Sequence, residues 1–187
     1  MSAATTTRSA SDSFALLPLL AAVVVAAAIV GWLLFHDRGT AEPATIATGP
    51  VLVSAKQLAV EAKSLGRPIY WAGPRSKWSY ELTVTNSGRI FVRYLPRGAA
   101  AGDSRSGFLT VGTYPAPNAY PNLKKVSTGY GVHSNLLPNG GLLVAPTRLP
   151  KNVYLAYPND GYQVEVYDAS TGAARRMALN GLIEQIR

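Results

Sequence analysis

A long uncharged segment near the start of the chain limits what this sequence can form. The 22 residues from Phe14 to Phe35, FALLPLLAAVVVAAAIVGWLLF, contain no charged side chain. At about 1.5 Å of rise per residue, a helix of this length spans the roughly 30 Å of hydrocarbon in a bilayer. We therefore predict a transmembrane helix over 14–35, with Pro18 in its first turn and Trp32 near the headgroups.

A cleaved signal peptide is the alternative interpretation of this segment, because Arg8 precedes it. A signal core usually has only about 7 to 15 apolar residues, and no convincing A-x-A site follows directly, so an uncleaved anchor is favoured. Arg8 and Arg38 nearly balance across the segment, so charge alone does not set its orientation. The short tail over 1–13 favours a cytoplasmic N-terminus, with the rest of the chain outside the cell membrane.

The same N-terminal region leaves room for a partner. Residues 1–13 are too few to form a folded output domain, so any signal would have to pass through another protein. Small residues at i, i+4 spacing permit close helix packing, although an Ala-rich composition gives this pattern by itself. The candidate packing positions are Ala22, Ala26, Ala27 and Gly31. If they pack against another helix, the chain is an accessory subunit of a membrane complex.

The remaining chain is predicted to form a linker and one domain. It has no cysteine, which excludes disulfides, thiolate metal sites and cysteine nucleophiles. Residues 36–50 show no apolar period and are rich in Thr, Ala, Gly and Pro, which is typical of a linker. An extracytoplasmic domain is expected over 51–187. It opens with a helix in SAKQLAVEAKSLG, where Ser54 and Gln57 make a capping box and Gly66 ends the helix.

Two hairpins are the clearest strand signals. In WSYELTVTNSGRIFVRYLPR, a loop of Asn86-Ser87-Gly88 places Glu81 opposite Arg93 and all the apolar side chains on the other face. The face with Glu81 and Arg93 is expected to meet solvent. In NVYLAYPNDGYQVEVYD, a loop over 158–161 likewise gathers the apolar residues on one side.

Weaker signals complete the predicted fold. PIYWA, FLTVGTY and the stretch around LLPNGGLLV favour strands, and NAYPNLKKVS favours a short helical turn. The tail from Ser170 fits either a short helix followed by a strand or one interrupted helix. We predict an α+β domain with a mostly antiparallel sheet of about six or seven strands, packed by the N-terminal helix.

Several segments also carry a family resemblance. GRPIYWAGP, GRIFVRYL, FLTVGTYP and VYLAYP leading to VEVYD resemble uncharacterised membrane-anchored, extracytoplasmic proteins of high-GC Gram-positive bacteria. The resemblance covers most of the region after the linker. It implies an exported domain, and it implies no activity, cofactor or site residue.

Residues suited to catalysis or metal binding are sparse. The two histidines are His36 and His133, and without cysteines or clustered carboxylates they predict no metal site and no cofactor. Ser134 is no nucleophile for His133, because strand neighbours point to opposite faces. We leave open one enzymatic alternative, an envelope hydrolase or transferase that uses Glu165, Asp168 or His133.

Positive charge is the main functional signal. Between Ala62 and Asn159 there are twelve Lys or Arg residues against two acidic ones. On a tethered domain this favours anionic lipid, acidic cell-wall polymers or an acidic protein, and no nucleic acid is expected outside the cell. The candidate anion-binding residues are Arg89, Arg93 and Arg97. We therefore predict a membrane-tethered, non-catalytic binding module with a basic surface.

Aromatic side chains could contribute to such binding. The chain has ten Tyr, together with Trp71 and Trp78 in the predicted domain, and exposed rings stack on sugars while arginines hold acidic groups. Tyr80, Tyr94, Tyr157 and Tyr162 fall on predicted core faces, however. Ordinary strand-forming positions are therefore the favoured interpretation for most of the rings.

Overall fold

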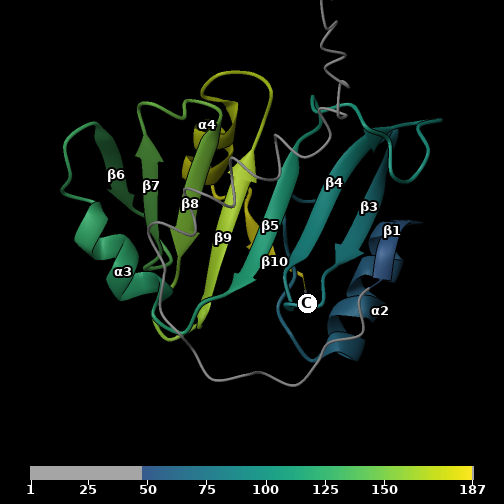
Figure 1. Ribbon diagram of the computed structural model, residues 1–187, viewed down its shortest axis with the longest axis horizontal. Coiled ribbons are helices and arrows are strands. Elements are labelled where there is room, and N and C mark those ends of the chain that lie inside the picture. The colour runs from purple at the N-terminus through teal and green to yellow at the C-terminus, as the bar shows by residue number, and fades with distance from the viewer. Residues whose placement is uncertain (1–47, 187) are drawn as a thin grey trace, which may run out of the picture.

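The computed structural model describes residues 48–186, which Figure 1 shows in colour. Three helices and ten strands lie in this range. The helices are α2 (Ala55–Leu65), α3 (Ala119–Val126) and α4 (Ala173–Leu179). The strands are β1 (Thr48–Val53), β2 (Tyr70–Trp71), β3 (Trp78–Val84), β4 (Ile90–Pro96), β5 (Thr110–Pro115), β6 (Val132–Leu136), β7 (Leu142–Pro146), β8 (Asn152–Ala156), β9 (Tyr162–Tyr167) and β10 (Glu184–Gln185).

The N-terminal expectations fall outside this range. The tail over 1–13 and the transmembrane helix over 14–35, with its packing residues, remain predictions. Within 48–186, no helix is long and apolar enough to cross a membrane. The ordered sheet begins earlier than expected, because β1 includes the last three residues of the predicted linker. Gly49 and Pro50 hide this strand in the sequence, since both residue types are rare in strands.

One large antiparallel sheet forms the body of the domain. Its eight strands run in the order β1-β3-β4-β5-β9-β8-β7-β6, and every neighbouring pair is antiparallel. β2 and β10 form a separate two-stranded sheet. Figure 1 shows α3 beside β6 and β7 at one end of the row and α2 near β1 and β3 at the other. The predicted α+β class is confirmed, but the main sheet has eight strands rather than six or seven, because β1 lacks a strand-like sequence pattern.

Both predicted hairpins are confirmed with their registers. In β3 and β4, Glu81 lies opposite Arg93. Gly88 adopts the left-handed φ of +74° that the three-residue loop needs. In β8 and β9, Val153 lies opposite Val166. Because side chains alternate along a strand, these registers put the apolar residues of both hairpins on the same face of the sheet.

That face is covered by α2 and α4. The Gln57 backbone N–H donates to the Ser54 hydroxyl at 3.2 Å, and the Ser54 N–H donates to Gln57 Oε1 at 2.7 Å, so the predicted capping box is confirmed. Leu58 and Ala62 are buried against the sheet. Gly66 ends the helix with a left-handed φ of +61°. In the C-terminal tail, α4 followed by β10 confirms the first of the two predicted alternatives.

The opposite face is also covered, which corrects the prediction of a solvent-facing surface at Glu81 and Arg93. Glu81 is only 1% exposed. The loop over 97–109 folds across β3 and β4, and its Gly102 N–H donates to Glu81 Oε2 at 2.6 Å. Farther along, α3 packs on β7 and β8. The alternating pattern identifies the two faces of a hairpin, but it does not show that an irregular loop covers the polar one.

Candidate functional site

The structure separates the three arginines singled out in the sequence. Arg93 lies within β4, where its Nη1 donates to Glu81 Oε1 at 2.7 Å. Arg89 precedes the strand, with its guanidinium 5.8 Å from the centre of the Tyr114 ring. Arg97 follows the other end of β4. At about 3.4 Å per residue, the backbones of Arg89 and Arg97 are roughly 27 Å apart, so one small anion cannot contact all three side chains.

Arg93 is committed to contacts within the protein. Its Nη2 donates to the backbone carbonyls of Asp103 at 2.8 Å and Arg105 at 3.1 Å. Its guanidinium also lies 5.2 Å from the centre of the Phe108 ring. Hydrogen bonds from Arg105 hold the pKa of the Asp103 carboxyl at about 2, so this loop carries its own ion pair. Arg93 therefore anchors the 97–109 loop rather than facing a ligand.

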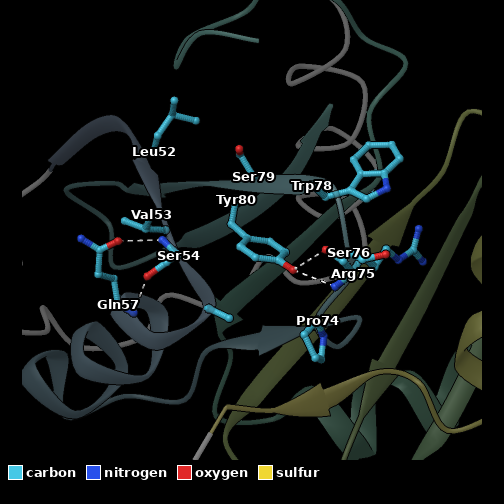
Figure 2. Close-up of a pocket in the computed structure, with 11 residues that line it drawn as sticks. Leu52, Val53, Ser54, Gln57, Pro74, Arg75, Ser76, Trp78, Ser79 and Tyr80 are labelled. Carbon is cyan, nitrogen blue, oxygen red and sulfur yellow. Dashed lines mark hydrogen bonds between the residues drawn. The ribbon is translucent and has the colours of Figure 1, made fainter. Parts of the chain in front are cut away.

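A surface groove lies at the start of β3. Figure 2 shows it between the end of β1, the first turn of α2 and the segment that leads into β3. The groove has a volume of about 640 Å³. None of its lining residues is acidic. The side chains used below are Leu52, Ser54, Gln57, Trp78 and Ser79.

Tyr80 fixes one wall of the groove. Its hydroxyl accepts a hydrogen bond from the Arg75 backbone N–H at 2.8 Å and lies 3.4 Å from the Arg75 carbonyl, as the dashed lines in Figure 2 show. The Arg75 guanidinium lies 5.2 Å from the centre of the Tyr94 ring, and its Nη2 lies 2.9 Å from Met177 Sδ. The charge of Arg75 is therefore directed toward the core, and its backbone shapes the groove.

Trp78 stands at the open side of the groove and is 39% exposed. It is paired with Pro96. Lys77 precedes Trp78 and Arg97 follows Pro96, so both lie at the same end of the β3–β4 pair, and both are exposed. Lys77 has a φ of +67°, a left-handed conformation that costs a residue with a side chain roughly 1–2 kcal/mol. Strain of this kind is often kept at functional sites.

This arrangement has a defined binding chemistry. An exposed indole stacks on flat apolar surfaces, such as the faces of sugar rings. The Gln57 amide nitrogen and the hydroxyls of Ser54 and Ser79 supply hydrogen bonds. Two cations beside a groove without carboxylates attract negative charge.

A second cavity, of about 610 Å³, has the opposite electrostatic character. It lies between α2 and β10, and Glu184 contributes a carboxylate to its lining. The rings of Tyr70 and Tyr157 stack with their centres 5.5 Å apart. The Tyr70 hydroxyl donates to Asp160 Oδ2 at 2.9 Å. Burial, followed by this hydrogen bond, raises the pKa of the Tyr70 phenol, so the ring stays neutral and serves as packing.

The three candidate catalytic residues do not meet in one site. Glu165 is buried in β9, whereas His133 is exposed on β6 and points to the other face of the sheet, with β8 and β7 between them. Asp168 follows β9, and its Oδ1 accepts from the Ser170 N–H at 2.8 Å. Within residues 48–186, no group of three or more His, Asp or Glu side chains could hold a metal ion.

Glu165 belongs instead to a buried polar cluster that joins β5, β8 and β9. The Tyr114 hydroxyl donates to its Oε2 at 2.7 Å, and Asn152 Nδ2 donates to its Oε1 at 2.9 Å. Gly112 leaves room for the Tyr114 ring, because a Cβ there would lie 2.8 Å from it. The Tyr154 hydroxyl is buried beside the same carboxylate and has no hydrogen-bond partner of good geometry among the described residues. Burial raises the pKa of Glu165 and outweighs the opposing effect of the hydrogen bonds.

Glu165→Gln is expected to change the pH dependence of stability. Because the folded-state pKa of Glu165 exceeds its unfolded value of about 4.3, this group lowers the free energy of unfolding as pH rises between the two values. Glutamine does not titrate, so the variant avoids this loss of free energy of unfolding, which is about 1.4 kcal/mol for each pH unit between the unfolded and the folded pKa of Glu165. Urea unfolding from about pH 4 to about pH 8 should show the variant gaining stability relative to the parent. Glu184→Gln, at an exposed carboxylate, is the control. An equal gain in stability there would contradict the conclusion that burial of Glu165 causes the effect.

Among the candidate anion-binding residues predicted from the sequence, Arg97 alone lies in the groove region, and Trp78 is named there only as one of the rings that could stack on a sugar. Trp78 was expected on the core face, and its alternation is correct, but it lies at the strand end, where the core stops. Ser54 and Gln57 are recognisable as a helix cap and give no sign of also lining a groove. Lys77 carries no signal in the sequence, because a left-handed lysine is not predictable from its neighbours.

Comparison of the chain with protein-family models, with curated proteins and with solved structures finds no match.

Proposed function

We propose that this domain is a non-catalytic binding module that holds an anionic, sugar-containing polymer of the cell envelope in the groove at Trp78. The observation that carries the proposal is an exposed indole beside hydroxyl and amide groups, with Lys77 and Arg97 next to it and no carboxylate in the lining. The indole would stack on a sugar ring. The two cations would attract its acidic substituents.

The charge of the whole chain supports an anionic ligand. Its formal net charge is +8 at pH 7. Long-range attraction raises the rate at which a negatively charged polymer reaches the groove, while stacking and hydrogen bonds select for sugar. The predicted anchor over 14–35 would keep the domain next to such a polymer. This refines the proposed anion site: Arg97 stays in it, Arg89 lies at the far end of β4 and Arg93 is enclosed.

The other functional classes receive less support. An envelope hydrolase or transferase would need at least two of Glu165, Asp168 and His133 in one pocket, and β7 and β8 separate Glu165 from His133. An accessory role in a membrane complex depends on the segment over 14–35, which lies outside the described residues.

Trp78→Ala is expected to weaken binding of the full chain to immobilised polyuronate by about two- to twelvefold, because one aromatic contact contributes roughly 0.5–1.5 kcal/mol. Retention should be measured in mild detergent at low and high salt, with a neutral polysaccharide resin as the control matrix. No retention of the parent chain at any ionic strength would refute the proposal.

Lys77→Gly separates binding from stability. Glycine adopts a φ of +67° without steric cost, so the variant should be at least as stable as the parent while its retention on polyuronate falls about two- to fivefold. Thermal unfolding and retention are measured on the same samples. Lys125→Ala, on the exposed surface of α3, is the charge control. An equal loss of retention in both variants would mean that the polymer binds the charged surface in general and not the groove.

A further inference from the structure

The outer edge of β6 presents unpaired backbone groups. The Leu137 N–H donates to the Gly141 carbonyl at 2.7 Å, and the Thr147 N–H donates to the Gly131 carbonyl at 2.8 Å. With the antiparallel register of β6 and β7, these bonds show that the backbone N–H and C=O groups of the odd-numbered residues of β6 point toward β7. The N–H and C=O groups of Val132, Ser134 and Leu136 therefore point outward, where no described strand pairs with them.

The two edges of the large sheet differ in how they are protected. Natural edge strands avoid pairing with other chains by means of proline, lysine, bulges or short length. At the other edge, β1 contains Pro50 and an irregular register between Thr48 and Val51. β6 is five residues long with the sequence VHSNL, and its pairing with β7 is regular. It has none of the usual protective features, so this edge is open to another strand.

The distribution of charge determines which strand can approach the outer edge of β6. The chain has a net charge of +8, so two copies repel each other over most of their surfaces. From Ser127 to Thr147, however, there is no Lys, Arg, Asp or Glu. The edge at β6 thus carries no charged side chain of its own on a cationic domain, and the Arg175 guanidinium lies near it, with Nη2 donating to Asn135 Oδ1 at 3.4 Å. Beside it, Leu136 is 71% exposed and Tyr130 is fully exposed, which leaves apolar surface at both ends of the strand.

We propose that β6 pairs with β6 of a second copy of this chain, antiparallel and centred on Ser134. This register is self-complementary. It brings the outward N–H and C=O groups of Val132, Ser134 and Leu136 onto those of Leu136, Ser134 and Val132 of the second copy. On the face that carries α3, each exposed Leu136 packs against a Val132, on either side of a Ser134 pair. On the other face, His133 lies opposite Asn135 of the second copy, a polar pair without like charges.

The interface is small, which sets the conditions of the test. Five paired residues on each side bury less than the roughly 1,200–2,000 Å² of a standard stable interface, so the dimer is weak in dilute solution. Two copies anchored in one membrane would meet at a much higher effective concentration. A covalent trap in detergent micelles or membranes is therefore more informative than a measurement of mass in dilute solution.

Paired cysteine variants test the register in the full chain, which has no native cysteine. In the proposed pairing, residue 133 of one copy faces residue 135 of the other with Cα atoms about 4.5 Å apart, within the range of a disulfide. Identical positions lie roughly 8 Å apart, which is too far. A mixture of His133→Cys and Asn135→Cys chains should therefore form a disulfide-linked dimer under mild oxidation, at least tenfold more than either variant alone.

Proline at position 134 supplies the control. The Ser134 N–H points away from β7, so Ser134→Pro removes no bond within the domain and is tolerated on an edge strand. Added to both cysteine variants, it should abolish the cross-link without lowering the thermal unfolding temperature. Cross-linking that persists with proline, or that is equal in the single variants and the mixture, would overturn the proposal. So would a mixture that forms no cross-link.

Discussion

Replacing Arg93 by methionine is expected to lower the free energy of unfolding by about 3–5 kcal/mol, the usual effect of leaving a buried charge without its partner, because the Glu81 side chain is buried although that of Arg93 is 21% exposed. Glu81 is 1% exposed and would keep its charge in the protein interior, where the Gly102 N–H is the donor that remains to it among residues 48–186. The backbone carbonyls of Asp103 and Arg105 would also lose their hydrogen bonds to Nη2. Urea unfolding followed by circular dichroism gives the free energy.

Two further variants show whether the uncompensated charge is responsible. Arg105→Met removes an arginine of the same loop whose side chain is 65% exposed, and it should have a much smaller effect. Adding Glu81→Gln to Arg93→Met removes the buried charge and should recover at least half of the lost stability. If the double variant is as unstable as Arg93→Met alone, the loss comes from the loop contacts and not from Glu81.

Leu58→Ala is expected to cost about 2–5 kcal/mol, because a fully buried leucine leaves a cavity when it is truncated. Leu58 has 0% exposure and packs α2 on the sheet. The first turn of α2 lines the groove, so the same variant should also weaken polyuronate retention. Val60→Ala is the control in the same helix, since Val60 is 58% exposed and alanine favours helices. Equal destabilisation by both variants would mean that α2 does not pack as described.

The elements that could be predicted from sequence are those whose geometry is local. The hairpin of β3 and β4 follows from side-chain alternation and from Gly88, because only one loop length keeps the apolar residues on one face. The cap of α2 is equally local, since it needs only Ser54 and Gln57. The two-residue strand β10 could be predicted only as one of two alternatives, because two residues carry no periodicity and their pairing is set by the chain around them.

The environment of the candidate residues was less predictable. Arg89, Arg93 and Arg97 share a spacing of four, which places them along one strand but says nothing about what covers each one. The 97–109 loop encloses Arg93, and no pattern in its sequence indicates where it folds. The groove at Trp78 is formed by residues that are distant in the chain, from β1 to the start of β3, so its existence depends on tertiary packing that propensities do not report.

The pairing of β5 with β9 has a consequence for how the chain is made. Pro115 of β5 pairs with Tyr162 of β9, 47 residues later. The other adjacent strand pairs from β4 to β9, such as β4 with β5 and β8 with β9, are consecutive in the chain and are joined by shorter connections. The loop that this pairing closes is long, so it forms late compared with the hairpins. During synthesis from the N-terminus, β5 is therefore complete while its partner is still missing. Until β9 is synthesised, the growing chain exposes another open edge in the middle of its future sheet, and any factor that assists its folding would have to shield that strand.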